Sequence, residues 1–355
     1  MTSRNISVVV ALCWMLLACT TAPTVMHYHP EKMNLEGGLV WPSAPEVARY
    51  RFTGALLGEQ NFGLDEQSRP STGQRFLRWL VGLGASLRES PRELVRPQTG
   101  MVDGAGRILV TDAGRQAVFV FDEPQGKLFI WRQADEYGEF LSPVGIAAGL
   151  NGEILVADSG LARVVRLDTQ GSPIGSFGQN VLGRPTGLAR DPAAGQVYVA
   201  DTRDHDVKVF DDQGRLIRRI GGRGDTPGQF NAPTHLAFVQ GKLYVTDTLN
   251  ARVQVLTPEG EPLLSIGKRG LYLGNFTRPK GVTADQDGNV YVVESYYDHL
   301  LIFDNQGRFL LPVGGTGAAV GQFFLPAGVW ADTQGRIFVA DMFNGRVVIF
   351  QYLGA

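Results

Sequence analysis

The sequence contains very little cysteine, and its only two cysteines lie near the N-terminus. Cys13 and Cys19 are followed by no further thiol up to residue 355. Residues 20–355 therefore contain no disulfide, no thiolate zinc site and no cysteine nucleophile. The fold must be stabilised by a buried hydrophobic core, which a chain of this length can form.

A concentrated run of lysine and arginine is also missing, and the formal net charge is −2. Nucleic acid is not expected as a partner, because binding to it requires a dense basic surface. Glycine is frequent, with 45 residues, and aromatic and β-branched residues recur in short runs. These features predict an all-β protein with many turns.

The first 18 residues have the features of a signal peptide. Arg4 precedes the apolar run Ile6–Leu17, which is short for a bilayer span. The run ends in Leu-Leu-Ala-Cys19, which resembles the lipobox of bacterial lipoproteins. The resemblance implies cleavage before Cys19, lipidation of that cysteine and a place in the bacterial cell envelope, and Thr20 favours the periplasmic side of the outer membrane. A secretory signal that happens to contain a cysteine is the alternative.

Residues 19–45 show no hydrophobic period, which predicts a lipidated tether between the membrane and the folded domain. His27 and His29 lie in it and are interpreted as solvated side chains rather than as a metal site. Val47–Leu57 alternates like a strand, and Gln74–Leu83 has the apolar spacing of a short amphipathic helix. That helix is expected to cap the domain, with membrane contact and partner docking as alternatives.

From residue 97 onward one pattern is repeated six times, in units of roughly 46 residues with four short strands each. The opening prolines are Pro97, Pro143, Pro185, Pro233, Pro279 and Pro326. The acids that end the second strands are Asp112, Asp158, Asp201, Asp247, Glu294 and Asp341. The pattern predicts an all-β, six-bladed β-propeller with four antiparallel strands per blade. The motif Pro-x-Gly…Gly-x-Ile/Val-Tyr-Val-x-Asp…Arg-Val-x-Val-Phe resembles the NHL repeat, which implies a ring used mostly as a binding platform.

The sixth unit has only three strands before the sequence ends. An open outer edge would invite pairing with other chains. We therefore expect Val47–Leu57 to supply the missing outermost strand, so that residues 46–355 form a single propeller domain.

A residue that recurs in every blade cannot mark a unique site, so the repeated acids are interpreted as turn-stabilising groups. Departures from the repeat are more informative. A candidate ligand rim consists of His205, His235, Lys280, Glu294, Tyr296, Tyr297 and His299. Ordinary loop variation is the competing explanation.

No nucleophile and base stand at a defined spacing, so no catalytic residue, metal site or cofactor is predicted. The function expected is a lipid-anchored envelope scaffold for a protein, peptide or glycan. The sequence predicts no particular oligomeric state. A metal-dependent lyase or lactonase is the alternative. The similar lyases need three histidines at the starts of inner strands, and in this chain only His235 occupies such a place. The lactonases need carboxylate and asparagine metal ligands in the channel, and the candidates Asp103 and Asp332 recur as turn residues, like Asp285. A structural subunit of an envelope or secretion complex is the second alternative.

Overall fold

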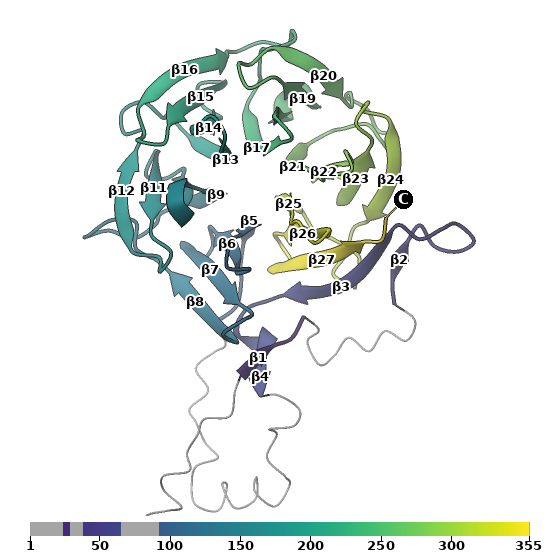
Figure 1. Ribbon diagram of the computed structural model, residues 1–355. Helices are drawn as coiled ribbons and strands as arrows, with labels where there is room; N and C mark the ends of the chain where they lie inside the picture. The colour runs from purple at the N-terminus through teal and green to yellow at the C-terminus, as the bar shows by residue number, and fades with distance from the viewer. Residues whose placement is uncertain (1–23, 29–37, 65–91, 355) are drawn as a thin grey trace, which may run out of the picture.

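The computed structural model describes residues 24–28, 38–64 and 92–354. They form a ring of six antiparallel sheets, so the predicted six-bladed β-propeller is confirmed (Figure 1). Cys19, His29 and the predicted helix Gln74–Leu83 lie outside the described residues. Within the described ranges, no helix is long and apolar enough to cross a membrane.

Blades 1 to 5 are each built from four consecutive strands, which run in order from the central channel to the outer rim. Blades 1 and 2 contain β5 (Pro97–Val102), β6 (Ile108–Asp112), β7 (Ala117–Asp122), β8 (Lys127–Trp131), β9 (Pro143–Ala148), β10 (Ile154–Asp158), β11 (Arg163–Leu167) and β12 (Pro173–Phe177). Blades 3 and 4 contain β13 (Pro185–Asp191), β14 (Gln196–Asp201), β15 (Asp206–Asp211), β16 (Leu216–Gly221), β17 (Pro233–Val239), β18 (Lys242–Asp247), β19 (Arg252–Leu256) and β20 (Pro262–Ile266). Blade 5 contains β21 (Pro279–Ala284), β22 (Val290–Glu294), β23 (His299–Phe303) and β24 (Phe309–Gly314). The 3₁₀ helices are η1 (Glu59–Asn61), η3 (Leu150–Gly152) and η4 (Thr248–Asn250).

Blade 6 joins the two ends of the chain. Its sheet has the order β2 (Val40–Trp41), β3 (Tyr50–Leu56), β27 (Arg346–Tyr352), β26 (Arg336–Asp341) and β25 (Val329–Ala331). The N-terminal strand β3 pairs antiparallel with β27, as predicted, and β2 adds a short fifth strand outside it. The ring is therefore closed by hydrogen bonds between segments almost 300 residues apart.

The hydrophobic core lies between neighbouring blades. The middle strands β6 and β7 are buried along their whole length, because a neighbouring blade covers each face of their sheet. The outer strand β8, by contrast, alternates between exposed and less exposed side chains. Large apolar residues from adjacent blades share one buried cluster, as Phe119 of blade 1 and Phe338 of blade 6 do.

The ring has two distinct faces. Each inner strand begins beside the end of the second strand, as in the pairs Pro97↔Asp112 and Pro279↔Glu294. One face therefore carries the segments that lead into the inner strands and the turns between the second and third strands. We call it the entry face, and the opposite side, with the remaining turns, is the exit face.

The repeated acids hold the entry face together. The Asp112 carboxylate accepts hydrogen bonds from the backbone N–H groups of Val95, Arg96 and Arg115. The acids of the other five blades accept in the same way from the segment entering their own blade. All six are almost completely buried. The sequence predicted that these acids stabilise the turn that follows their strand. In the structure they also bind the segment that enters the blade.

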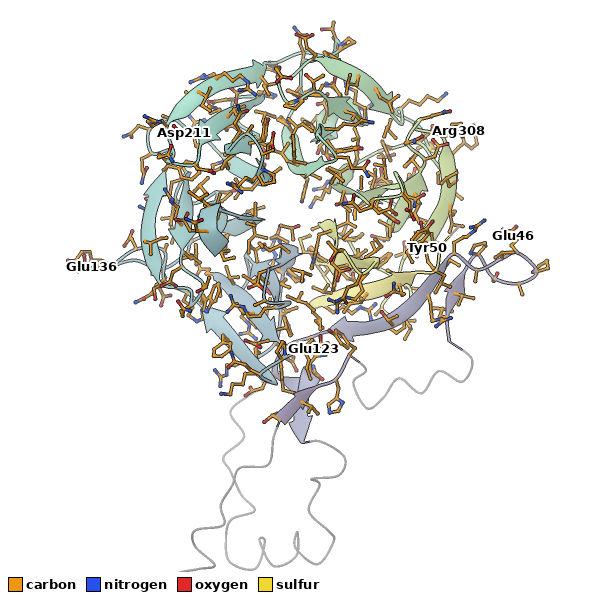
Figure 2. The ribbon with its side chains drawn as sticks, in the orientation of Figure 1. Glu46, Tyr50, Glu123, Glu136, Asp211 and Arg308 are labelled. Carbon is orange, nitrogen blue, oxygen red and sulfur yellow. The ribbon has the colours of Figure 1, made fainter. Side chains whose placement is uncertain are left out.

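Part of the predicted tether is folded. β1 (Thr24–Met26) pairs with β4 (Phe62–Leu64) in a small sheet beside blade 1, and Phe62 stacks on Phe121 at a centroid distance of 6.2 Å. The hydroxyl of Tyr28 donates to Glu123, which Figure 2 labels at this junction, and accepts from Arg336. The structure therefore differs from a free tether here, because Met26, Tyr28 and Phe62 are partly buried against the ring.

Candidate functional site

The inner strands of all six blades surround a central channel of about 1240 Å³. The channel is lined toward the exit face by the turns that follow the inner strands, including those at Asp103, Asp285 and Asp332. Asp103 pairs with Arg107 at 2.7 Å and Asp332 with Arg336 at 2.6 Å. Asp285 accepts from the hydroxyl of Tyr291. These carboxylates are thus engaged in holding their own turns.

Glycines let neighbouring inner strands approach closely near the entry face. The N–H of Gly281 donates to the carbonyl of Ala327 at 2.8 Å, and a Cβ on Gly281 would lie 2.5 Å from the nitrogen of Val329. Only a residue without a side chain fits there. In blades 1 and 4 the same position carries Thr99 and His235, so these two opposed blades interrupt the glycine pattern.

His235 lines the channel on β17. Its Nδ1 lies 3.1 Å from the hydroxyl oxygen of Thr234. Burial, with the positive charge of Lys280 adding to it, lowers the pKa of His235 to about 3. The imidazole is therefore neutral at neutral pH. The sequence placed this residue at the channel, and the structure brings it within electrostatic reach of Lys280.

Lys280 lies on β21 at the entry-face mouth and is half-buried. Burial, followed by the charges of Arg278 and Arg96, lowers the pKa of Lys280 to about 8. Across the described part of the chain, its ammonium group has no hydrogen-bonding or ion-pairing partner. At neutral pH the site therefore contains a largely protonated cation beside two other cations.

The side chains of two further residues of the predicted rim accept hydrogen bonds from backbone N–H groups. His205 adopts a left-handed conformation, with φ 58°, and its Nδ1 accepts the N–H of Ala232 at 3.0 Å. Glu294 is one of the buried repeat acids and accepts the N–H of Thr277. His299 begins β23, and its Nδ1 is buried without a hydrogen-bond partner among the described residues. The side chains of His205 and Glu294 therefore hold their loops in place rather than project from them.

An aromatic patch crosses blades 5 and 6 on the entry face. Tyr296 packs edge-on against Tyr297 at a centroid distance of 4.9 Å, and Phe324 packs edge-on against Phe343 at 5.6 Å. The N–H of the residue after Phe324 donates to Asp298, which joins the two pairs. Tyr296, Phe324 and Phe343 are 59%, 44% and 52% exposed. Sequence reasoning missed Phe324 and Phe343, although Phe343 occupies the same register as Tyr296 one repeat later.

The exposed apolar side chains of the loops are concentrated on the same face. Those on the entry face are Val95, Tyr137, Leu141, Leu249, Leu271, Tyr272, Leu273, Tyr296, Phe324 and Phe343. Among the described loops of the exit face, the corresponding residues are Val47, Leu150 and Leu353. An exposed apolar surface of this kind is typical of an interaction site.

Blade 3 contains a carboxylate cluster with the spacing of a metal site. Oxygens of Asp201, Asp204 and Asp206 lie within 4.8 Å of one another. The ammonium of Lys208 lies 2.8, 2.7 and 2.9 Å from these carboxylates, respectively. The lysine therefore occupies the position that a cation would take, and the cluster is an internal ion-pair network.

Comparison with known proteins supports the repeat assignment locally. Residues 182–210, which span the start of blade 3, match the family described as NHL repeat. A 71-residue stretch, 20% of this chain, is 37% identical to NHL-repeat-containing protein 4 of Homo sapiens. The match spans 56% of that protein's length, so the chain spans about half of the relative it matches. The chain is thus a six-bladed β-propeller containing NHL-repeat sequence.

Solved structures agree in fold. A gluconolactonase from Xanthomonas campestris is 16% identical with a TM-score of 0.55, over 76% of this chain and 92% of that chain. An auxiliary nutrient binding protein from Bacteroides thetaiotaomicron is 12% identical with a TM-score of 0.58, over 74% of this chain and 70% of that chain. At these identities the likeness shows the fold alone.

Proposed function

We propose that this protein is a binding scaffold of the bacterial cell envelope that presents the entry face of its propeller to a protein partner. The observation that carries the proposal is the larger number of exposed apolar loop residues on the entry face, together with the aromatic patch of Tyr296, Tyr297, Phe324 and Phe343. Attachment through a lipid on Cys19 is proposed from the lipobox resemblance.

The architecture suits this role energetically. Loops of the entry face are bonded to the buried repeat acids, so they are already ordered before a partner arrives. Little conformational entropy is then lost on binding. Exposed aromatic residues supply large contact areas, and such residues dominate the binding energy of many protein interfaces.

The charged residues of the entry face indicate the chemical character of the partner. Arg96, Arg278 and Lys280 lie at the centre of this face, and the nearby repeat acids are buried and occupied by backbone N–H groups. A surface with apolar and acidic groups is complementary to it. We therefore favour a protein segment of that composition over a glycan.

Photo-crosslinking in cells tests the proposal with the full-length chain. A photoreactive amino acid is placed at Phe343 and, as a control, at Ile217, which is 47% exposed on the outer strand β16. We expect one discrete adduct at position 343 and none at 217. The double substitution Tyr296→Ser and Phe324→Ser, with the crosslinker kept at 343, should reduce the adduct roughly tenfold without changing the melting temperature. Equal adducts at both positions would contradict the proposal.

A further inference from the structure

The entry-face mouth of the channel has an unbalanced positive charge. It is formed by six four-residue segments that lead into the inner strands, residues 96–99, 142–145, 184–187, 232–235, 278–281 and 325–328. These segments contain four cations, Arg96, Arg184, Arg278 and Lys280, and no aspartate or glutamate. A ring of this kind attracts an anion because no carboxylate within it neutralises the field.

The repeat acids that are bonded to the backbone of these segments are not available as counter-ions. Asp112 accepts the backbone N–H of Arg96, and Glu294 accepts that of Arg278. Both acids are buried below the surface, whereas both arginine side chains are exposed. In the described part of the chain, the guanidinium groups of Arg96 and Arg278 have no hydrogen-bond acceptor. Three cations therefore remain free to bind an external group.

Lys280 is the central member of this set. It is the least exposed of the cations, and burial followed by the charges of Arg278 and Arg96 lowers its pKa to about 8. The imidazole of His235, on which Lys280 acts electrostatically, is neutral and offers no negative charge. An anion in contact with Lys280 would relieve the repulsion among the three cations and replace the water that the ammonium has lost.

We propose that the entry-face mouth binds a carboxylate of the protein partner, with Lys280 as the buried contact and Arg96 and Arg278 as flanking donors. The inference rests on the proposed function, because it names the chemistry of the group that the scaffold recognises. Arginine suits a planar carboxylate through paired N–H donors.

The aromatic patch lies directly beside this site. The N–H of Ser295 donates to the carbonyl of Arg278 at 3.1 Å, so the turn that carries Tyr296 begins at the cation cluster. A peptide whose carboxylate contacts Lys280 thus has an apolar surface within reach of its neighbouring side chains. An acidic residue beside an aromatic or aliphatic one, or a C-terminal residue with an apolar side chain, fits both features.

Calorimetric titration of the full-length protein in detergent tests the site, with sodium citrate as the carboxylate probe and sodium chloride at matched ionic strength as the blank. We expect citrate to bind, and Lys280→Met to weaken binding roughly tenfold. The matched control is Lys242→Met, which removes an exposed lysine at the start of β18 and should leave binding unchanged. Lys280→Arg, which keeps the charge, should restore most of the affinity.

Several results would overturn the site. They are unchanged citrate binding in Lys280→Met, an equal loss in Lys242→Met, and no citrate binding by the unmodified protein. Inorganic phosphate is titrated in a separate experiment. Tighter binding of phosphate than of citrate would reject a carboxylate as the ligand. Should Lys280→Met not fold, the double variant Arg96→Gln and Arg278→Gln provides the same test on exposed side chains.

Failure of this inference is distinguishable from failure of the proposed function. Crosslinking at Phe343 that survives Lys280→Met would retain the scaffold and reject the carboxylate site. Citrate binding that depends on Lys280, without any adduct at Phe343, would retain the site and reject the docking face.

Discussion

Leu56, on the strand nearest the N-terminus of the ring, pairs with Val347 on the strand nearest its C-terminus. Both side chains are completely buried, and they belong to the same apolar cluster as Phe119 and Phe338. The seam between β3 and β27 is therefore part of the core, and closure of the ring contributes directly to the stability of the protein.

The seam predicts a large effect of a small truncation. Leu56→Ala should lower the free energy of unfolding by about 2–5 kcal/mol, because it leaves a cavity where the two termini meet. Urea denaturation measures the change. Arg51→Ala, on the exposed side of the same strand, is the control and should cost less than about 0.5 kcal/mol. Equal stability of the two variants, or an unchanged melting temperature after deletion of residues 46–60, would mean that the ring does not depend on β3.

The ammonium of Lys208 is predicted to be indispensable to blade 3. Burial by itself lowers the pKa of this lysine, but its bonds to Asp201, Asp204 and Asp206 outweigh burial and raise it overall. Lys208→Met would leave buried carboxylates without a counter-ion and should cost about 3–5 kcal/mol at neutral pH. Urea denaturation measures the loss, with Lys127→Met on the exposed side of β8 as the control.

Both calcium and acidification should reduce the loss of stability caused by Lys208→Met. Calcium chloride is expected to stabilise Lys208→Met and not the unmodified protein, because the carboxylates become free to bind a cation. In the unmodified protein the pKa of Asp201 is lowered, since its bonds to Lys208 and to backbone N–H groups outweigh burial. This group therefore stabilises the native state above its unfolded pKa, and the contribution is lost as the pH falls. The difference between the two proteins should consequently shrink on acidification, and a constant difference would contradict the ion-pair network.

His235 should make stability sensitive to weak acid. Between its ordinary pKa of 6.5 and its native pKa of about 3, the unfolded chain binds a proton that the native state does not. The contribution of this group is complete above pH 6.5 and is lost as the pH falls toward 3, by up to ~1.4 kcal/mol per pH unit. His235→Gln removes that slope. The test compares the two proteins by urea denaturation across this range, and parallel pH profiles would show that the imidazole is not buried in the native state.

Lys280 should make stability depend on pH in the alkaline range. At neutral pH its charged ammonium should destabilise the native state. Between its native pKa of about 8 and its ordinary value of 10.5, the unfolded state binds more protons, so stability due to this group rises with pH. Lys280→Met should therefore be more stable than the unmodified protein at pH 7, by about 1–3 kcal/mol, and should lack the rise. Thermal unfolding at a series of pH values measures this. A variant less stable at pH 7 would show that the ammonium has a partner.

Lipidation at Cys19 remains a prediction from the N-terminal sequence. Metabolic labelling with an alkyne fatty acid should mark the unmodified protein, and Cys19→Ala should lose both the label and the membrane fraction. Cys13→Ala is the matched control and should keep both, because that residue precedes the predicted cleavage point. Labelling that persists in Cys19→Ala would reject this anchor.

The sequence by itself determined the number of blades and the strands of each repeat, and the strand missing from the sixth unit predicted the closing strand. The blades and their strands depend on local spacing: prolines that open inner strands, acids such as Asp112 that end second strands, and apolar runs between glycine turns. Such features act through hydrogen bonds and burial within one repeat or between adjacent repeats, so they can be recognised along the chain. The structural role of the acids was visible for the same reason, since a residue repeated in every blade serves the blade.

Only the tertiary structure decided which side chains meet across the ring. The sequence marked His235 and Lys280 as departures from the repeat, but their electrostatic contact, and that of Lys280 with Arg96, depends on the radius of the ring and the tilt of its inner strands. The sequence grouped His205 with them because of its loop, yet its imidazole accepts the backbone N–H of Ala232, a segment 27 residues further along the chain. Packing of β1 and Tyr28 on blade 1 was likewise hidden, since a short segment with no period becomes ordered only where a complementary surface exists.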